Sequence, residues 1–273
     1  MPPAAHRKMS DPNIGTRSGS DIDLTNHPSI DVWDGTFARL VPLLDRTDVL
    51  CDRERRDIVS ARAGAVRDAR ALSRIALRLA LGRTLGVAAA DLPLRRGAHG
   101  KPVLPGGPSF NVSHTDAHLV IAIAKDQSIG VDVERLRPMT DWKSVAAIAF
   151  TDRERDTLAM TAAGAGDQRD RLKAMDDVSR ALLAGWTRKE ALLKGVGLGV
   201  TRHLLDVEVR LGAFCNDALV RASLPGTSAR DWRVLAFDNL PDLVGAIAIR
   251  SRVPPILCSR SLDELLQPTA MER

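Results

Sequence analysis

GVDVE, residues 130–134, is the stretch on which the expected fold and site depend. Its apolar residues predict a buried strand, and side chains on a strand alternate between two faces. Val131 and Val133 therefore share one face, while Asp132 and Glu134 share the other. Two carboxylates this close repel each other and raise each other's pKa unless a positive charge lies between them. The pattern suggests a metal ion, for which the rest of the chain must supply a third ligand.

The composition is that of a globular protein with a sizeable core. The chain has 273 residues, of which 44% are hydrophobic, enough for one large domain or two small ones. A net charge of +5 permits an anionic ligand or partner without requiring one. Cys51, Cys215 and Cys258 lie far apart and form no CxxC pair, which favours a reducing compartment over a disulfide framework or zinc cluster.

Several functional classes are disfavoured by what the sequence lacks. The apolar runs are shorter than a membrane span, and the N-terminus has no signal-peptide pattern, so we expect a cytoplasmic protein with no membrane contact. Tyrosine is absent and aromatic residues make up 3% of the chain, which leaves little for a surface that stacks on bases.

Hydrophobic periodicity and turn residues divide the chain into expected elements. Residues 1–28 are rich in small polar residues and proline, and predict a flexible leader. A polar segment at 161–177 predicts a loop or loosely packed insert. Helices are expected over about 52–85, from Pro138 through FTDRERDTLAM, and over about 178–194. Strands are expected at 29–37, 118–124, 128–134, 203–211, 232–238 and 243–250, with a Gly- and Pro-rich loop at 97–108 and the short turn KDQ between the 118–124 and 128–134 strands.

Two of the expected strands are near copies of each other. LVIAIA (119–124) and LVGAIAI (243–249) each lie downstream of a long helix. Chance likeness between apolar strands stays open as an explanation. If the repeat is real, the protein is a pseudo-dimer of two α+β halves, 29–136 and 137–273, with a ligand cleft at their seam. Such an internal pairing favours a monomer.

WTRKEALLKGVGLG, residues 186–199, places charge on one stripe of the last expected helix. Trp186, Glu190 and Lys194 are spaced four apart and so share a face. An ordinary solvated face with a Glu–Lys pair is the plain alternative. The glycines follow the lysine, whereas in a phosphate-binding P-loop they precede it, so they predict the end of the helix.

FNVSH (110–114) and GKP (100–102) bring polar side chains to strand and loop positions. Adjacent strand residues face opposite sides, so Ser113 is a poor partner for His114, and a phosphate contact by His114 suits the pattern better than a nucleophilic pair. A structural histidine is the alternative. Lys101, held between glycine and proline, either has a fixed role or belongs to a surface turn. The arginines of residues 53–78 form either a solvated helical face or a surface for phosphate or an acidic protein.

The order GKP, FNVSH, GVDVE, FTDRE, WTRKEALLKGVGLG resembles the Sfp-like 4'-phosphopantetheinyl transferases. The resemblance covers about residues 49–199. It implies a pseudo-dimeric α+β fold with the active site between the halves. It also implies transfer of the phosphopantetheine arm of coenzyme A to a serine of an acyl or peptidyl carrier protein, with release of 3',5'-ADP.

The matching motifs also imply roles for individual residues. Asp132, Glu134 and Glu190 correspond to ligands of a magnesium ion, which prefers oxygen donors. Glu154 corresponds to an acidic position near the site. The residues expected to contact coenzyme A are Arg70, Lys101, Pro102, Ser113, His114 and Lys194, with Arg55 or Arg56 as a further contact that spacing does not decide.

Glu190, His114 and Lys194 are the expected catalytic residues. Glu190 is expected to accept the proton of the carrier serine, directly or through a water, while Lys194 and His114 offset charge on the diphosphate. Two alternatives stay open: another magnesium-dependent phosphotransferase acting on a nucleotide, and a basic nucleic-acid-binding module built on the arginine-rich helix. The second is disfavoured because three clustered carboxylates would repel phosphate unless a cation is bound.

Overall fold

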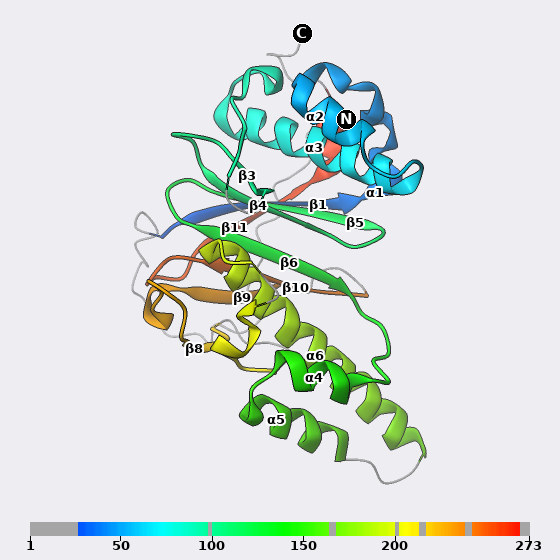
Figure 1. The fold of residues 1–273 in the computed structure, drawn as a ribbon, viewed down its shortest axis with the longest axis vertical. Helices are drawn as coiled ribbons and strands as arrows, with labels where there is room; N and C mark the ends of the chain where they lie inside the picture. The colour runs from blue at the N-terminus through cyan, green and yellow to red at the C-terminus, as the bar shows by residue number, and fades with distance from the viewer. Residues whose placement is uncertain are drawn as a thin grey trace, which may run out of the picture.

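The structure, a computed structural model, describes residues 27–97, 100–163, 168–199, 202–212, 217–237 and 242–267. Two β-sheets pack face to face, and helices cover the outer face of each sheet, which gives four layers (Figure 1). The expected α+β class is confirmed. The leader expected at 1–28 lies outside the described residues except for His27 and Pro28.

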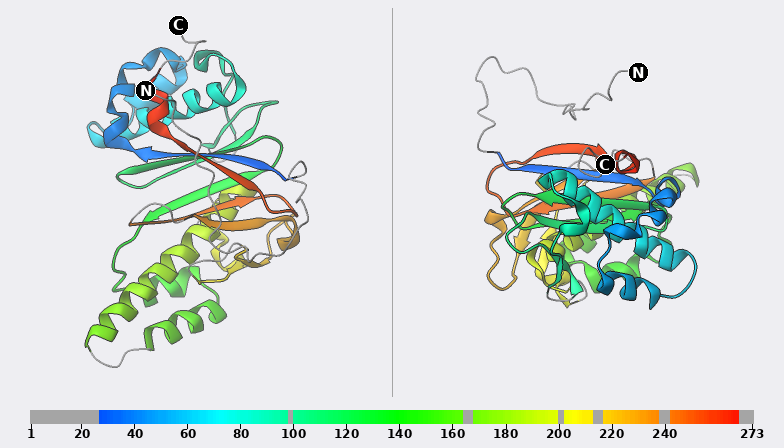
Figure 2. Two further views of the ribbon diagram at one scale, coloured as in Figure 1. Left: turned by 180° about the vertical axis from the view of Figure 1, so that it is seen from behind. Right: turned by 90° about the horizontal axis from the view of Figure 1, so that it is seen from above.

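The first sheet has the strand order β11-β1-β5-β4. β1 (Ser29–Thr36) pairs in parallel with β11 (Ile256–Ser261), so strands from the two ends of the described chain lie side by side (Figure 2). β5 (His118–Ala124) lies between β1 and β4 (Ser109–His114). Both faces of β5 are buried: its odd-numbered residues face α3 (Ala65–Leu85), and its even-numbered residues from Val120 onward face the second sheet. This explains its continuous apolar sequence.

The second sheet has the order β6-β10-β9, with antiparallel pairing throughout. Its strands are β6 (Ile129–Arg135), β10 (Leu243–Ile249) and β9 (Arg233–Phe237). One face packs on the first sheet, and the other packs on the long helix α6 (Gln168–Val196). α4 (Trp142–Ala149) and α5 (Asp152–Ala163) lie against α6 on the far side from the sheet (Figure 1).

Short elements complete the fold. α1 (Phe37–Leu40) and α2 (Asp52–Val59) pack with α3 over the first sheet. The two small hairpins pair β2 (Arg95–Arg96) with β3 (Pro102–Val103), and β7 (Val207–Val209) with β8 (Leu219–Ala222). The 3-10 turns are η2 (Val41–Asp45), η3 (Thr47–Val49), η4 (Ala89–Asp91), η7 (Leu204–Asp206), η8 (Ala229–Asp231) and η9 (Leu262–Leu266).

Glycines let α6 lie directly against the backbone of β6. A Cβ atom added at Gly130 would lie 2.0 Å from the carbonyl oxygen of Ala191 and 2.4 Å from the backbone nitrogen of Gly195. One added at Gly195 would lie 2.7 Å from the ring of Trp232. Since Gly130 is two residues before Asp132 on the same strand face, this close approach brings the C-terminal turns of α6 to the predicted carboxylates.

Two expectations about the helical segments are wrong. The helix expected over 52–85 is two helices, because the chain turns at residues 60–64 and Gly64 has φ of 79°. The loop expected at 161–177 is helical in α5 up to Ala163 and in α6 from Gln168 onward; residues 164–167 lie outside the described segments. Among the residues of this polar stretch whose burial the structure describes, only a narrow stripe, including Ala174, is buried, so the apolar period was too weak to predict a helix.

The strands on either side of the KDQ turn belong to different sheets. β5 pairs with β1 and β4, whereas β6 pairs with β10, so this turn carries the chain from one sheet to the other. Of the strand expected at 203–211, only Val207–Val209 is extended in a ladder. None of the helices within the described segments has the length and apolar character needed to cross a bilayer.

Candidate active site

Two side chains of β4 join the edges of the sheets. β6 is an edge strand, so its outward N–H groups need partners from elsewhere. Oδ1 of Asn111 accepts the N–H of Val131 at 2.9 Å, and Oγ of Ser113 accepts the N–H of Val133 at 3.3 Å. Polar side chains thus take the place of a strand ladder at this seam.

Asp132 is the buried centre of the site, with only 3% of its surface exposed. Its Oδ1 accepts hydrogen bonds from the Ser113 hydroxyl at 2.8 Å and from the Lys194 ammonium at 2.5 Å. Its Oδ2 is buried and has no hydrogen-bond partner among the described residues. Burial raises the pKa of Asp132, Lys194 and Ser113 act to lower it, and the Glu134 charge adds to the rise.

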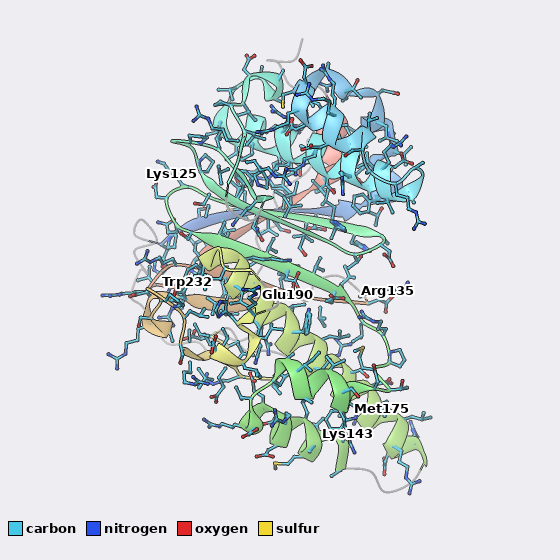
Figure 3. The ribbon with its side chains drawn as sticks, in the orientation of Figure 1. Lys125, Arg135, Lys143, Met175, Glu190 and Trp232 are labelled. Carbon is cyan, nitrogen blue, oxygen red and sulfur yellow. The ribbon has the colours of Figure 1, made fainter. Side chains whose placement is uncertain are left out.

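Glu190 and Lys194 both belong to α6, which packs against β6. Figure 3 labels Glu190 on this helix. They are one helical turn apart, and Lys194 Nζ lies 3.6 Å from Oε2 of Glu190. Burial, followed by the charge of Asp132, raises the pKa of Glu190 to about 7. Lys194 opposes this rise, and Glu134 adds to it. The ammonium of Lys194 therefore contacts both carboxylates.

Glu134 lies on the same strand face as Asp132, as the alternation predicts, but nearer to solvent. Opposite them on β10 are Ala246 and Val244, which both pack toward α6. The carboxylate of Glu134 is 31% exposed and pairs with Arg137 at 3.1 Å. The charge of Glu134 therefore raises the pKa of Asp132 and of Glu190, while its own carboxylate forms an ion pair with Arg137.

The oxygen donors of this cluster suit a magnesium ion, which prefers carboxylates and substrate phosphates. The unpartnered, buried Oδ2 of Asp132 is the donor that most needs a positive ligand. Among the described residues no three acidic, histidine or cysteine side chains already stand together as an ion-binding group. In this structure Lys194 and Arg137 are instead the cationic side chains that pair with Asp132 and Glu134.

Lys101 connects the GKP loop, residues 100–102, to the end of α6 and the start of β6. Its ammonium donates to the carbonyl oxygen of Lys194 at 3.0 Å and to that of Ile129 at 3.4 Å, so it contacts the end of α6 and the start of β6. Burial lowers the pKa of Lys101, and the charge of Lys194 lowers it further. Pro102 follows in β3, opposite Arg96.

His114 and Arg70 stand apart from the carboxylates. His114 is exposed at the end of β4, where its ring packs edge-on against the ring of Phe37, with the two ring centroids 5.9 Å apart. Arg70, on α3, donates to the carbonyl oxygen of Asp57 at 3.1 Å. Burial lowers the pKa of Arg74, Glu54 and Asp57 act to raise it, and the charges of Arg70 and Arg96 lower it further, so these three arginines lie close to one another.

Glu154 is not part of this cluster. It is 2% exposed and pairs with Lys189 at 2.7 Å, inside the core that α6 forms with α4 and α5. It also accepts the backbone N–H groups of Thr151 and Val209, each at 2.8 Å. The acidic position expected near the site therefore holds α5, α6 and β7 together.

Sequence reasoning missed Asn111, Gly130 and Gly195. The position of Gly130 next to the carboxylates in GVDVE was a usable signal, because glycine inside a strand often marks a close backbone approach. Asn111 gave no such signal, since its role depends on which strand edge lies opposite it.

Comparison with known proteins shows which family the chain resembles. The family model described as ACPS, 4'-phosphopantetheinyl transferase superfamily, matches residues 128–248, from the start of β6 to the end of β10. The match therefore contains Asp132, Glu134, Glu190 and Lys194.

Named relatives agree with the family model. The chain is 31% identical to the 4'-phosphopantetheinyl transferase HetI of Nostoc sp. over 140 residues, which are 50% of this chain and 54% of that protein. It is 29% identical to the 4'-phosphopantetheinyl transferase ffp of Bacillus subtilis over 138 residues, 50% of this chain and 54% of that protein.

The coverage is greater for a third relative. Identity to the 4'-phosphopantetheinyl transferase AcpT of Salmonella typhi is 30% over 152 residues, which are 55% of this chain and 70% of that protein. The matched part thus spans about half the length of the Nostoc and Bacillus proteins and more than two thirds of AcpT. The chain belongs to the 4'-phosphopantetheinyl transferase superfamily.

Proposed function

We propose that the protein transfers the 4'-phosphopantetheine moiety of coenzyme A to a serine of an apo acyl or peptidyl carrier protein, with magnesium and with release of 3',5'-ADP. Its membership of the superfamily and the names of its relatives support this activity. The observation that carries it is the meeting of Asp132 with Glu190 and Lys194 across the β6–α6 contact, where one buried carboxylate oxygen has no hydrogen-bond partner within the described segments.

Asp132, Glu134 and Glu190 would hold the magnesium ion. When bound, this ion neutralises negative charge on the diphosphate of coenzyme A. The oxygen-only donor set and the unpartnered Oδ2 of Asp132 support this assignment.

Lys194, Lys101 and His114 would contact the phosphates, with Arg70 at the nucleotide's 3'-phosphate. Lys194 is well placed for a change of partner, since it is 22% exposed and lies at the edge of the cluster. In the proposed reaction the serine oxygen bonds to the β-phosphorus, the bond from that phosphorus to the ADP oxygen breaks, and Glu190 accepts the serine proton. Lys194 and His114 stabilise the charge that develops on the leaving diphosphate oxygen.

We infer that the fold consists of two related halves, divided near residue 136, with this site at their seam. The near-copy strands β5 and β10 each have a neighbouring strand on both sides in their sheets. Each sheet also carries a long helix on its outer face, α3 on the first and α6 on the second. Each half also lends a strand to the other: β6 lies in the sheet of β9 and β10, and β11 lies beside β1.

The wider setting is part of the same proposal. The partners are coenzyme A and a carrier protein, without nucleic acid or membrane, and a monomer in the cytoplasm is expected. Free thiols at Cys51 and Cys258 fit a reducing compartment.

The test is incubation of the protein with coenzyme A, magnesium and a panel of apo carriers, followed by mass measurement of each carrier. The expected result is one added phosphopantetheine arm on at least one carrier, abolished by Glu190→Gln with unchanged thermal unfolding. No added arm on any carrier would contradict the proposed activity, and full activity of the Glu190 variant would remove that residue from the mechanism.

A further inference from the structure

Ser113 uses all of its hydrogen-bonding capacity inside the protein. A hydroxyl group has one donor hydrogen and two acceptor lone pairs. Oγ of Ser113 accepts the N–H of Val133 and the ammonium of Lys194, each at 3.3 Å, and donates to Oδ1 of Asp132 at 2.8 Å. Ser113 is only 6% exposed. In this arrangement it has no proton left for a substrate phosphate, which is the contact that the family resemblance implies.

The hydrogen bonds of Ser113 and Lys194 both go to one oxygen of Asp132. Oδ1 accepts a hydrogen bond from each of them, whereas Oδ2 is buried without a partner among the described residues. The residue after Asp132, Val133, holds Ser113 through its backbone N–H. The β6 backbone thus fixes the serine, and the serine fixes the carboxylate.

We propose that Ser113 is a positioning residue that acts through Asp132 rather than a phosphate ligand. It holds Oδ1, so that Oδ2 is presented to the divalent cation. This inference rests on the proposed cation site. When Lys194 turns toward substrate, the hydroxyl of Ser113 is the remaining donor that keeps the Asp132 carboxylate in place. Hydrogen-bond partners of metal-binding groups typically change metal affinity by about 10–100-fold when they are removed.

Asn111 provides a matched control for this role. It lies two residues earlier on β4, is 7% exposed, and its side chain accepts the N–H of Val131 just as Ser113 accepts that of Val133. Its hydrogen bond goes to the backbone of β6 instead of to the Asp132 carboxylate. Loss of Asn111 therefore weakens the seam between the sheets without removing the donor to Oδ1.

The experiment measures Mn²⁺ binding to the full chain without coenzyme A, from the electron paramagnetic resonance signal of free Mn²⁺, with Mg²⁺ as competitor. Ser113→Ala should weaken Mn²⁺ binding about 10–100-fold, whereas Ser113→Thr, which keeps the hydroxyl, should stay close to wild type. Asn111→Ala should lower the melting temperature as Ser113→Ala does, yet leave Mn²⁺ affinity within about twofold of wild type. Coenzyme A affinity in the presence of a chelator should be the same for Ser113→Ala and wild type.

The outcomes separate this inference from the proposed function. If Asp132→Asn binds Mn²⁺ as well as wild type, the cation site itself is wrong and the role of Ser113 falls with it. If Asp132→Asn weakens binding but Ser113→Ala does not, or if Asn111→Ala weakens it equally, only the positioning role is overturned. Weaker coenzyme A binding by Ser113→Ala in the chelator would instead establish a phosphate contact. Should Ser113→Ala fail to fold, Ser113→Cys, a poor donor of similar size, replaces it with the same expected loss.

Discussion

Substitution of Gly130 by alanine tests whether the close approach of α6 to β6 builds the site. The added Cβ atom would lie 2.0 Å from the carbonyl oxygen of Ala191, and ordinary contact begins at 3.4 Å, so the strand and helix must separate by about 1.4 Å. Both obstructing groups, this oxygen and the backbone nitrogen of Gly195, belong to the main chain and have no rotamer that removes the clash.

The expected cost has two parts. Overpacking of a tight core costs about 1–3 kcal/mol, and backbone obstruction places this substitution at or above the upper end of that range. A displacement near 1 Å at a catalytic group can cost about 100-fold in rate, and here it moves Glu190 and Lys194 away from Asp132. We therefore expect Gly130→Ala to lose at least about 3 kcal/mol of unfolding free energy and at least about 100-fold in the transfer rate.

The assay combines urea unfolding with the rate of carrier modification at a temperature where the variant is folded. Gly199→Ala is the matched control, because a Cβ there meets no atom of the described part of the chain within 4 Å, and it should change neither quantity. A Gly130→Ala protein with wild-type stability and rate would refute the reasoning, because the helix would then not depend on the bare strand backbone for its position.

Three further predictions concern charge. Lys189→Met should cost about 3–5 kcal/mol in urea unfolding, because it leaves the Glu154 carboxylate buried without its ion partner, and a loss below about 1 kcal/mol would contradict the role assigned to that pair. Lys194→Met should strengthen Mn²⁺ binding in the absence of coenzyme A by about tenfold or more, as measured by calorimetry, since the ammonium 2.5 Å from Asp132 competes with the cation; weaker binding would oppose this. Burial, chiefly, raises the pKa of Asp34 above its ordinary value of 3.8, so the stability linked to its protonation is present at pH 3 and lost as pH rises through the folded-state pKa. Asp34→Asn should therefore raise the melting temperature at pH 7 but not at pH 3, whereas the exposed Asp45→Asn should do neither, and equal melting curves for Asp34→Asn and wild type at pH 7 would contradict the prediction.

The alternation of apolar and polar residues was sufficient to predict the central strands and the side of β6 from which the carboxylates project. β1, β5, β6, β9 and β10 lie within a residue or two of their predicted ranges, because each buries at least one continuous apolar face. The pattern in GVDVE also placed Asp132 and Glu134 on one side of β6, and the helical spacing placed Glu190 and Lys194 on one side of α6.

What the sequence did not reveal depends on contacts between distant segments. Nothing in the KDQ turn distinguishes a hairpin from a crossing between sheets, and the parallel pairing of β11 with β1 joins residues more than 220 positions apart. The exposed first turns of α6 carry few buried residues and so have little periodic signal. The hydrogen-bond partners of Ser113 come from β6 and α6, two elements that converge with β4 only in the folded protein, so the FNVSH motif did not predict them.

The most direct test of the central claim is a crystal structure of the protein with coenzyme A and Mg²⁺. The account predicts one cation about 2.1 Å from oxygens of Asp132, Glu134, Glu190 and the coenzyme A diphosphate, with Lys194 moved from Asp132 to a phosphate oxygen. A complex in which Lys194 still pairs with Asp132, while the diphosphate and cation bind elsewhere, would contradict it.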